Sequence, residues 1–464
     1  MSNTHNTNDL GQGLKQRHVT MLSIAGVIGA GLFVGSGHAI AQAGPAVLLA
    51  YLGAGTLVVL VMRMLAEMAV ASPDTGSFST YADRAIGHWA GFTIGWLYWW
   101  FWVLVIPLEA SAAATILHAW FPDVAIWVFT LVITLLLTAT NLFSVKNYGE
   151  FEFWFALIKV LAILGFIALG AAAIFGWLPS SQVSGVSHLT DTQGFMPNGM
   201  GAVVAAMLTT MFSFMGTEIV TIAAAESKDP GQQITKATNS VIWRIFLFYL
   251  VSIFVVVALV PWNDPRLADV GSYQTVLDLM GIPNAKLIVD LVVLVAVTSC
   301  LNSALYTASR MLFSLSKRGD APAVAQRTTS SGTPHWAVML STAAAFLAVF
   351  ANYVAPAQVF AFLLASSGAI ALLVYLVIAV SQLRMRRQRM ARGEKIAFKM
   401  WLFPGLTWAT IVFIVGILTL MLIRPENRAE VLSTALLAIV VVAAGLLVAR
   451  RRKNERLGAA VLSR

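Results

Sequence analysis

The sequence predicts an all-α polytopic membrane protein with twelve transmembrane helices, and three observations support this fold class. Of the 464 residues, 58% are hydrophobic and 11% are charged, and the mean hydropathy is +0.79. One water-soluble globule cannot bury that much apolar surface, so the solvent must be lipid. Apolar runs of about 20 residues, long enough for a helix to cross a bilayer, fill the chain from Val19 to Ala449. Short loops separate these runs.

The loops between the runs contain turn residues, such as Ala43-Gly44-Pro45 and Trp177-Leu178-Pro179. Proline ends or starts a helix there because it lacks a backbone donor and fixes the backbone. The twelve expected spans are residues 19–43, 45–70, 87–117, 124–144, 151–176, 198–225, 240–260, 285–315, 335–354, 356–382, 401–423 and 428–449.

The placement of basic residues predicts the topology. Most of the 30 Lys and Arg fall in the tails and in loops on the side shared by both termini, including the run Arg384 to Lys399. The positive-inside rule then makes both termini cytoplasmic, with tails at 1–18 and 450–464. The first 18 residues lack the apolar core of a secretory signal, so we expect no cleaved leader. The basic segments should contact the headgroups of membrane lipids.

The same features exclude other classes of protein. The formal charge of +9 is spread over short loops, which argues against a nucleic-acid partner. The loops are too short for a soluble enzymatic domain, and no set of hydroxyl, histidine and carboxylate groups suggests catalysis. The seven histidines show no metal-ligand spacing, so we expect no metal and no cofactor. No ring of charges or filter repeat suggests a passive channel.

The first span is unusually rich in glycine, with Gly26, Gly29, Gly31, Gly35 and Gly37. Each glycine costs a helix about 1 kcal/mol, so a regular helix is not expected here. An unwound segment near the bilayer midplane would expose N–H groups that bind a carboxylate. The alternative is close helix packing, because Gly31 and Gly35 match the small-xxx-small pattern.

The sixth span contains a counterpart, Phe212-Ser-Phe-Met-Gly-Thr-Glu218, where a glycine is followed by an acid inside an apolar stretch. A carboxylate within the membrane is costly, so it indicates function. The two interrupted spans occupy corresponding positions in two halves, residues 19–176 and 198–382. This arrangement predicts an inverted repeat of five helices each, followed by two helices in 401–449.

Two more charged residues lie deep in predicted spans. Lys159 follows Glu150 by nine residues, which places it roughly 13 Å along a helix. It could carry a proton, or it could be a fixed cation that bonds carbonyl groups of the unwound first span. Glu109 follows Pro107 in the third span and could pair with a cation or a substrate amine, or be a satisfied structural acid.

Several segments resemble the amino acid/polyamine/organocation superfamily, amino acid transporter branch: Leu14 to Gly37, Pro73 to Tyr81, Gly149 to Lys159, Phe212 to Glu218 and Asn302 to Met311. Pro107-Leu-Glu-Ala, Ser144 to Glu150 and Asn239 to Arg244 are most similar to bacterial 4-aminobutyrate (GABA) permeases. The resemblance implies a LeuT-type fold in the bacterial inner (plasma) membrane. It also implies proton-coupled import of GABA or a related ω-amino acid by alternating access.

The resemblance also assigns roles to residues. Gly29, Ala30 and Gly31 would bind the carboxylate, and Phe214 would close over the substrate. Gly216 would free backbone groups in the sixth span, Glu218 would support the site, and Lys159 would stand at the position of a sodium ion. Proton coupling would then involve Lys159 and Glu109, with no sodium. The alternative substrates are proline, an aromatic amino acid or another α-amino acid. Relatives often have a hydroxyl residue where this chain has Ala30, so contacts there would come from the backbone. The expected substrate-binding residues are Ile28, Gly29, Ala30, Gly31, Phe214, Gly216 and Glu218.

Overall fold

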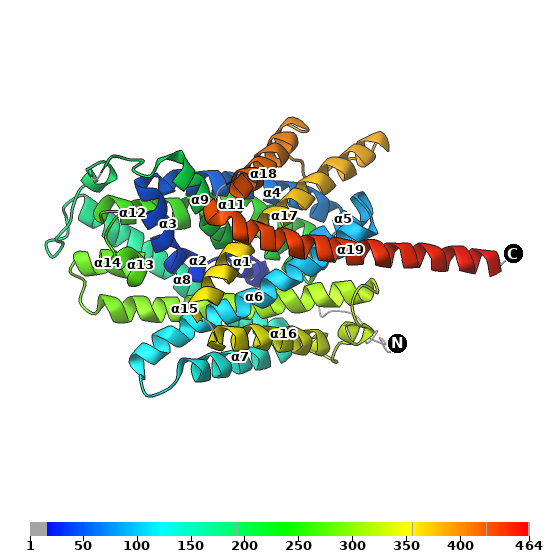
Figure 1. Ribbon diagram of the computed structural model, residues 1–464, viewed down its shortest axis with the longest axis horizontal. Coiled ribbons are helices and arrows are strands. Elements are labelled where there is room, and N and C mark those ends of the chain that lie inside the picture. Colours follow the sequence, from blue (N-terminus) through cyan, green and yellow to red (C-terminus); the bar gives the residue numbers. More distant parts are fainter. Residues whose placement is uncertain (1–15, 144, 192, 355, 424, 463–464) are drawn as a thin grey trace.

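The computed structural model describes residues 16–462, except 144, 192, 355 and 424, so most of the predicted N-terminal tail lies outside the described residues. The described chain is an elongated bundle whose helices run largely along its long axis (Figure 1). Its α-helices are α1 (Gln16–Ala25), α2 (Ala30–Phe33), α3 (Gly35–Ala43), α4 (Val47–Ala71), α5 (Ser77–Ala85), α6 (His88–Trp120), α7 (Ile126–Leu142), α8 (Val145–Ile174), α9 (Gly199–Phe214), α10 (Ile219–Ala225), α11 (Pro230–Arg244), α12 (Ser252–Leu259), α13 (Arg266–Asp269), α14 (Ser272–Leu279), α15 (Ala285–Lys317), α16 (His335–Val354), α17 (Pro356–Ala391), α18 (Gly405–Ile423) and α19 (Pro425–Leu462).

The predicted spans coincide with these helices. Within the described residues, nine helical segments are long and apolar enough to cross a membrane, and two shorter apolar helices lie at Ile126–Leu142 and His335–Leu347. One of the nine, Ala30–Ala71, includes part of the first predicted span and all of the second. The all-helical polytopic fold class is therefore confirmed.

Both glycine-containing interruptions are present. The first separates α1, which ends at Ala25, from α2, which begins at Ala30. The second separates α9, which ends at Phe214, from α10, which begins at Ile219. The backbone of Gly216 has φ +109°, which disfavours any residue with a Cβ, and an added Cβ would lie 2.3 Å from the carbonyl oxygen of Gly26. The two interruptions therefore contact each other.

Long helices enclose these interruptions. The helices α6 and α15 pack against each other and, with α7 and α16, fill the lower part of Figure 1. The helices α4, α9, α11 and α17 lie in the upper part of that view, and α1 contacts both α8 and α10. The interruptions thus lie in the interior of the bundle, where unpaired backbone groups need protein partners.

Several elements extend or interrupt the predicted spans. The helix α11 starts well before residue 240 because Asp229 caps it, accepting from the Gln232 amide at 3.2 Å, and Pro230 occupies its first turn. A π-helical segment, Ile245–Val251, joins α11 to α12. Such segments often mark functional positions. The helices α17 and α19 continue through basic sequence to Ala391 and Leu462, beyond the predicted membrane boundary.

Candidate functional site

A small pocket lies where the interruption of the first span meets α6, α9 and α15. Its cavity volume is about 10 Å³, which is room for about one water molecule. Its walls combine backbone from the interrupted segment with aromatic, apolar and acidic side chains. The lining residues are Gly26, Val27, Gly29, Gly31, Phe101, Trp102, Val105, Glu109, Phe212, Ser213, Met215 and Cys300.

The carbonyl groups of the first interruption are bonded by side chains from other elements. The ammonium of Lys159 (α8) donates to the Ile28 oxygen at 2.8 Å. The hydroxyl of Tyr249, in the π-helical segment, lies 3.0 Å from the Val27 oxygen and 2.8 Å from the Ser213 oxygen. One tyrosine therefore contacts the backbone next to both interruptions, which compensates for helical hydrogen bonds lost there.

The amide groups of the same segment are less completely bonded. The Ala30 amide donates to the Glu109 carboxylate, with distances of 3.1 and 3.3 Å to its two oxygens. Within the described part of the chain, the amides of Gly29 and Gly31 have no hydrogen-bond acceptor. Both residues line the pocket, so two N–H groups are available there to an anionic ligand group.

Glycine is required at both positions for a steric reason. An added Cβ on Gly29 would lie 2.6 Å from a Glu109 oxygen and 2.9 Å from Cys300. An added Cβ on Gly31 would lie 2.9 Å from the Ser213 hydroxyl. The backbone of the first span can thus approach α6, α9 and α15 only because these side chains are absent.

The acid of the sixth span binds backbone rather than lining the pocket. Each carboxylate oxygen of Glu218 lies 3.1 Å from the Gly216 amide, and the Tyr98 hydroxyl donates to it at 2.8 Å. Glu218 is fully buried. It therefore satisfies the donor that the interruption exposes and connects it to α6.

The predicted site residues divide into three groups by position. Gly29, Gly31 and Glu109 line the pocket. Ile28 and Ala30 contribute backbone groups, bonded to Lys159 and Glu109. The rest, Phe214, Gly216 and Glu218, lie outside the lining. The roles assigned to all these residues remain predictions.

Phe214 differs most from its expected position over the substrate. Its ring packs against Tyr249 and Tyr51, with centroid distances of 4.6 and 6.0 Å. The aromatic residue of this segment that lines the pocket is Phe212. Side chains two positions apart on a helix point in directions that differ by about 200°. The interruption motif alone therefore did not determine which of the two rings faces the pocket.

Residues that the sequence analysis left out also form the site. Trp102 is buried and lines the pocket with Val105 and Glu109. Their spacing of i, i+3 and i+7 places all three on one face of α6. The helical spacing from the intramembrane acid Glu109 was therefore the signal in the sequence that could have identified Trp102 and Val105 as lining residues.

A second buried acid accompanies Lys159 on α8. Glu152 lies seven residues before Lys159, on the same helical face. Its carboxylate accepts from the Ser299 hydroxyl at 2.7 Å and from the Asn302 side-chain amide at 2.5 Å. Asn302 in turn accepts from the Asn141 amide at 2.6 Å. This network ties α8 to α15 and α7 beside the first interruption.

A larger hollow of about 620 Å³ lies beyond the pocket, toward α13 and α14. Its walls include Phe33 and Ser111, which follow pocket residues Gly31 and Glu109 along their helices. The ring of Phe33 packs on Tyr273, with centroids 4.9 Å apart. The hollow therefore lies next to the pocket along α2 and α6.

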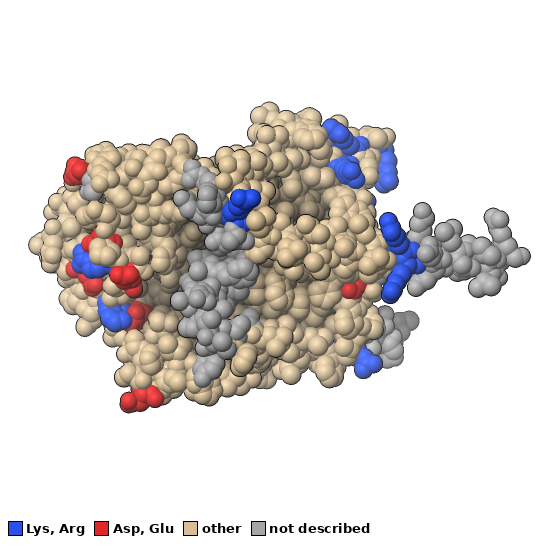
Figure 2. Space-filling model, in the orientation of Figure 1, with Lys and Arg blue, Asp and Glu red and all other residues tan. Residues whose placement is uncertain are grey.

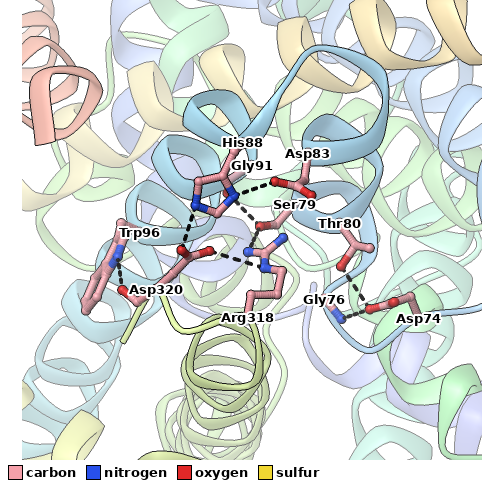
Figure 3. Close-up of polar contacts among 10 residues, drawn as sticks. All are labelled: Asp74, Gly76, Ser79, Thr80, Asp83, His88, Gly91, Trp96, Arg318 and Asp320. Carbon is pink, nitrogen blue, oxygen red and sulfur yellow. Dashed lines mark hydrogen bonds and ion pairs between the residues drawn. The ribbon is translucent and has the colours of Figure 1, made fainter. Parts of the chain in front are cut away.

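The opposite end of the molecule is closed by polar contacts. The guanidinium of Arg310 donates to the Glu226 carboxylate at 3.1 Å, with both side chains almost fully buried. Near the molecular surface, the imidazole of His88 lies between two carboxylates, 2.7 Å from Asp83 and 2.9 Å from Asp320 (Figure 3). These contacts connect α5 and α6 with the segment after α15.

The described residues contain no group of three or more His, Cys, Asp or Glu side chains that could hold a metal ion.

The family model for amino acid permeases matches residues 18–457. The chain belongs to the amino acid permease family. This permease is 72% identical to the "Probable GABA permease" of Pseudomonas aeruginosa, over 97% of this chain and 94% of that one. It is 68% identical to the "Gamma-aminobutyric acid permease" of Escherichia coli, over 98% and 97%. It is 44% identical to the "Aromatic amino acid transport protein AroP" of Corynebacterium glutamicum, over 92% and 93%.

The fold of the permease is shared with solved transporter structures. A manganese transporter from Eremococcus coleocola, in complex with an aromatic bis-isothiourea substituted compound, superposes with a TM-score of 0.56 over 97% of this chain and 99% of that one. The sequence identity is 13%, so this likeness concerns the fold alone. The LeuT-type fold and the family resemblance predicted from sequence are thus confirmed, and the permease is a membrane transporter rather than an enzyme.

Proposed function

We propose that this permease imports GABA or a closely related ω-amino acid together with a proton, by alternating access. The proposed substrate class is based on the sequence identity of 72% and 68% to the two GABA permeases over nearly the whole chain. The aromatic amino acid transporter is much more distant, at 44%.

The residues that line the pocket suit a small zwitterionic substrate once the walls separate to admit it. The amides of Gly29 and Gly31 provide donors for a carboxylate, and the Glu109 carboxylate on the same wall provides an acceptor for an ammonium group. The remaining walls, from Phe101, Trp102 and Phe212, are aromatic and suit a short methylene chain. A buried substrate thereby has both charges compensated.

The arrangement of Lys159 supports proton coupling without sodium. Its ammonium occupies the position next to the Ile28 carbonyl where a coupling cation would otherwise interact with the unwound backbone. A low-dielectric site disfavours the charged form of a lysine, so a buried lysine releases its proton more readily than an exposed one. A change in its protonation would alter how firmly α8 holds the first interruption.

The distribution of charge supports an orientation with both termini in the cytoplasm. Figure 2 shows Lys and Arg gathered at the end where α17 and α19 terminate, whereas the opposite end carries both signs of charge. By the positive-inside rule the first end faces the cytoplasm of the bacterial inner membrane. The hollow near α13 and α14 then opens outward, in the direction from which a substrate enters.

The test is uptake of labelled GABA into proteoliposomes that contain the purified permease. We expect accumulation to rise with an inward pH gradient and not to change when sodium is replaced by potassium. A strict sodium requirement would overturn the coupling. Excess unlabelled proline and aromatic amino acids should compete weakly, and strong competition would favour an α-amino acid as the substrate.

A further inference from the structure

The loop between α17 and α18, residues 392–404, is held in place by a buried acid. The Glu67 carboxylate (α4) accepts from the Gln382 side chain at 3.1 Å, from the Arg386 guanidinium at 2.9 Å and from the Met400 amide at 2.6 Å. Glu67 is only 3% exposed. Hydrogen bonds to a buried charge are strong, so this loop has a fixed path rather than a loose one.

Cation–aromatic contacts hold the same loop from a second side. The guanidinium of Arg63 donates to the Lys399 carbonyl at 2.9 Å. It also lies 4.0 Å from the Trp401 ring centroid and 4.5 Å from that of Phe398. Planar guanidinium groups stack well on aromatic rings. The loop therefore forms a preordered wall against α4 and α17.

Between this loop and α17 lies a pocket of about 560 Å³, which we call the basic pocket. Its lining contains three basic residues and one acid. The lining residues are Arg386, Met390, Glu394, Lys395, Ile396, Ala397 and Lys399.

The charges in the basic pocket are not balanced. Arg386 is paired with Glu67, and Glu394 is paired with Arg389 at 2.8 Å. Lys395 and Lys399 are exposed, and among the described residues neither has an acidic partner. Two ammonium groups therefore face a preformed space without compensation, which favours an anionic ligand.

The apolar surface beside the basic pocket locates it at the membrane boundary. Trp401 is 40% exposed, Leu402 is 79% exposed and Met390 is 57% exposed. Tryptophan is enriched at the level of lipid headgroups, and the membrane helix α18 begins at Gly405, directly after these residues. In Figure 2 the neighbouring Lys and Arg at the upper right lie over the end of α17. A ligand here would meet positive charge and apolar surface together.

We propose that the basic pocket is a binding site for the phosphate headgroup of an anionic phospholipid. The ammonium groups of Lys395 and Lys399 would contact the phosphate as point charges, while the acyl chains would lie along Met390 and Leu402. A role in membrane topology alone would require only that basic residues lie on one side of the membrane. It would not require an ordered loop that forms a pocket around these residues. The same cationic chemistry would accept free phosphate, so the lipid and free anion must be distinguished by experiment.

The test compares thermal unfolding of the full-length permease, purified in neutral detergent, with added phosphatidylglycerol, phosphatidylcholine or inorganic phosphate. The test variant is Lys395→Gln with Lys399→Gln. The matched control is Arg384→Gln with Arg387→Gln, which removes the same charge from exposed residues of α17 outside the pocket lining. Size-exclusion profiles and unfolding without lipid establish that both variants are folded.

We expect phosphatidylglycerol to raise the melting temperature of the wild type and the control equally, and that of the test variant by less than half as much. Phosphatidylcholine and millimolar inorganic phosphate should have little effect on any of them. Equal losses in both variants would overturn the site, because they would indicate diffuse attraction. An equal effect of inorganic phosphate would overturn the lipid as its ligand.

Discussion

The ammonium of Lys159 lies 2.8 Å from the carbonyl oxygen of Ile28, so a cation of the fifth predicted span bonds the unwound backbone of the first. This hydrogen bond joins α8 to the segment that separates α1 from α2. The same segment contributes Val27 and Gly29 to the wall of the pocket, which also carries Glu109 and Cys300. A proton gained or lost at Lys159 would therefore change the electrostatic potential in the pocket.

Replacement of Lys159 by alanine should abolish proton-driven accumulation of GABA while the protein still inserts. Alanine removes both the titratable group and the bond to the Ile28 carbonyl. Lys159→Arg separates these two functions, because arginine keeps a positive donor but does not release its proton. If Lys159 carries the proton, the arginine variant retains exchange of internal for external GABA without accumulation. If it is a fixed cation, accumulation survives in the arginine variant. Retained concentrative uptake in Lys159→Ala would make the residue a bystander.

Glu109→Gln should leave the fold intact but lower GABA uptake at least about tenfold, equivalent to about 1.4 kcal/mol. The glutamine oxygen can still accept from the Ala30 amide, whereas the charge that would compensate a substrate ammonium is lost. Uptake kinetics and thermal unfolding of the purified variant measure the two effects separately. Glu109→Ala is the contrasting variant, since it leaves the amide without an acceptor and should lower thermal stability. Normal uptake by Glu109→Gln would remove Glu109 from the substrate site.

Gly216→Ala should destabilise the folded state by at least about 2 kcal/mol. The added Cβ would meet the Gly26 carbonyl oxygen at 2.3 Å, and the backbone at φ +109° disfavours any side chain. The matched control is Gly165→Ala in α8, where an added Cβ has nothing within 4 Å and alanine is the better helix former. Melting temperatures in detergent should fall for Gly216→Ala and hold or rise for the control. Equal stability of both would mean that the two interruptions are not in close contact.

The buried pair Arg310 and Glu226 should behave as a coupled unit. Arg310→Met alone leaves a carboxylate that is almost fully buried without its cation, at a cost of about 3–5 kcal/mol. Adding Glu226→Gln removes that charge, and the Tyr306 hydroxyl, 2.8 Å from the carboxylate, still has an acceptor. The double variant should therefore recover most of the lost stability in a thermal unfolding cycle. Additive losses would show that the pair does not interact energetically.

Much of the architecture could be predicted from sequence because bilayer crossing imposes a simple requirement. A helix needs about 20 apolar residues to span the hydrocarbon, and such runs can be counted directly. Glycine clusters predict unwinding because glycine has a low helix propensity, which is also a local property. The interruptions at Gly26–Gly29 and around Gly216 lie where they were expected. Intramembrane charge is costly, which is why Lys159, Glu109 and Glu218 could be recognised.

Contacts between distant segments could not be predicted in the same way. The face of α9 that lines the pocket carries Phe212 rather than Phe214, because the choice depends on how α9 packs against α3, α4 and α17. Tyr249 reaches both interruptions from a π-helical segment that no apolar pattern marks. The helical extension of α17 and the ordered loop around Glu67 likewise depend on partners far away in the chain.

Local composition and short motifs were sufficient to predict the membrane class, the approximate limits of the long apolar helices, the places where two spans are interrupted, and the family. The three-dimensional packing was needed to show which amides of the first interruption lack an acceptor among the described residues. It was also needed to show which side chains bond the carbonyl groups of that segment and which aromatic residues line the pocket. Those outcomes depend on packing geometry to within about 1 Å, because a hydrogen bond is lost beyond about 3.5 Å, and no local pattern encodes such distances.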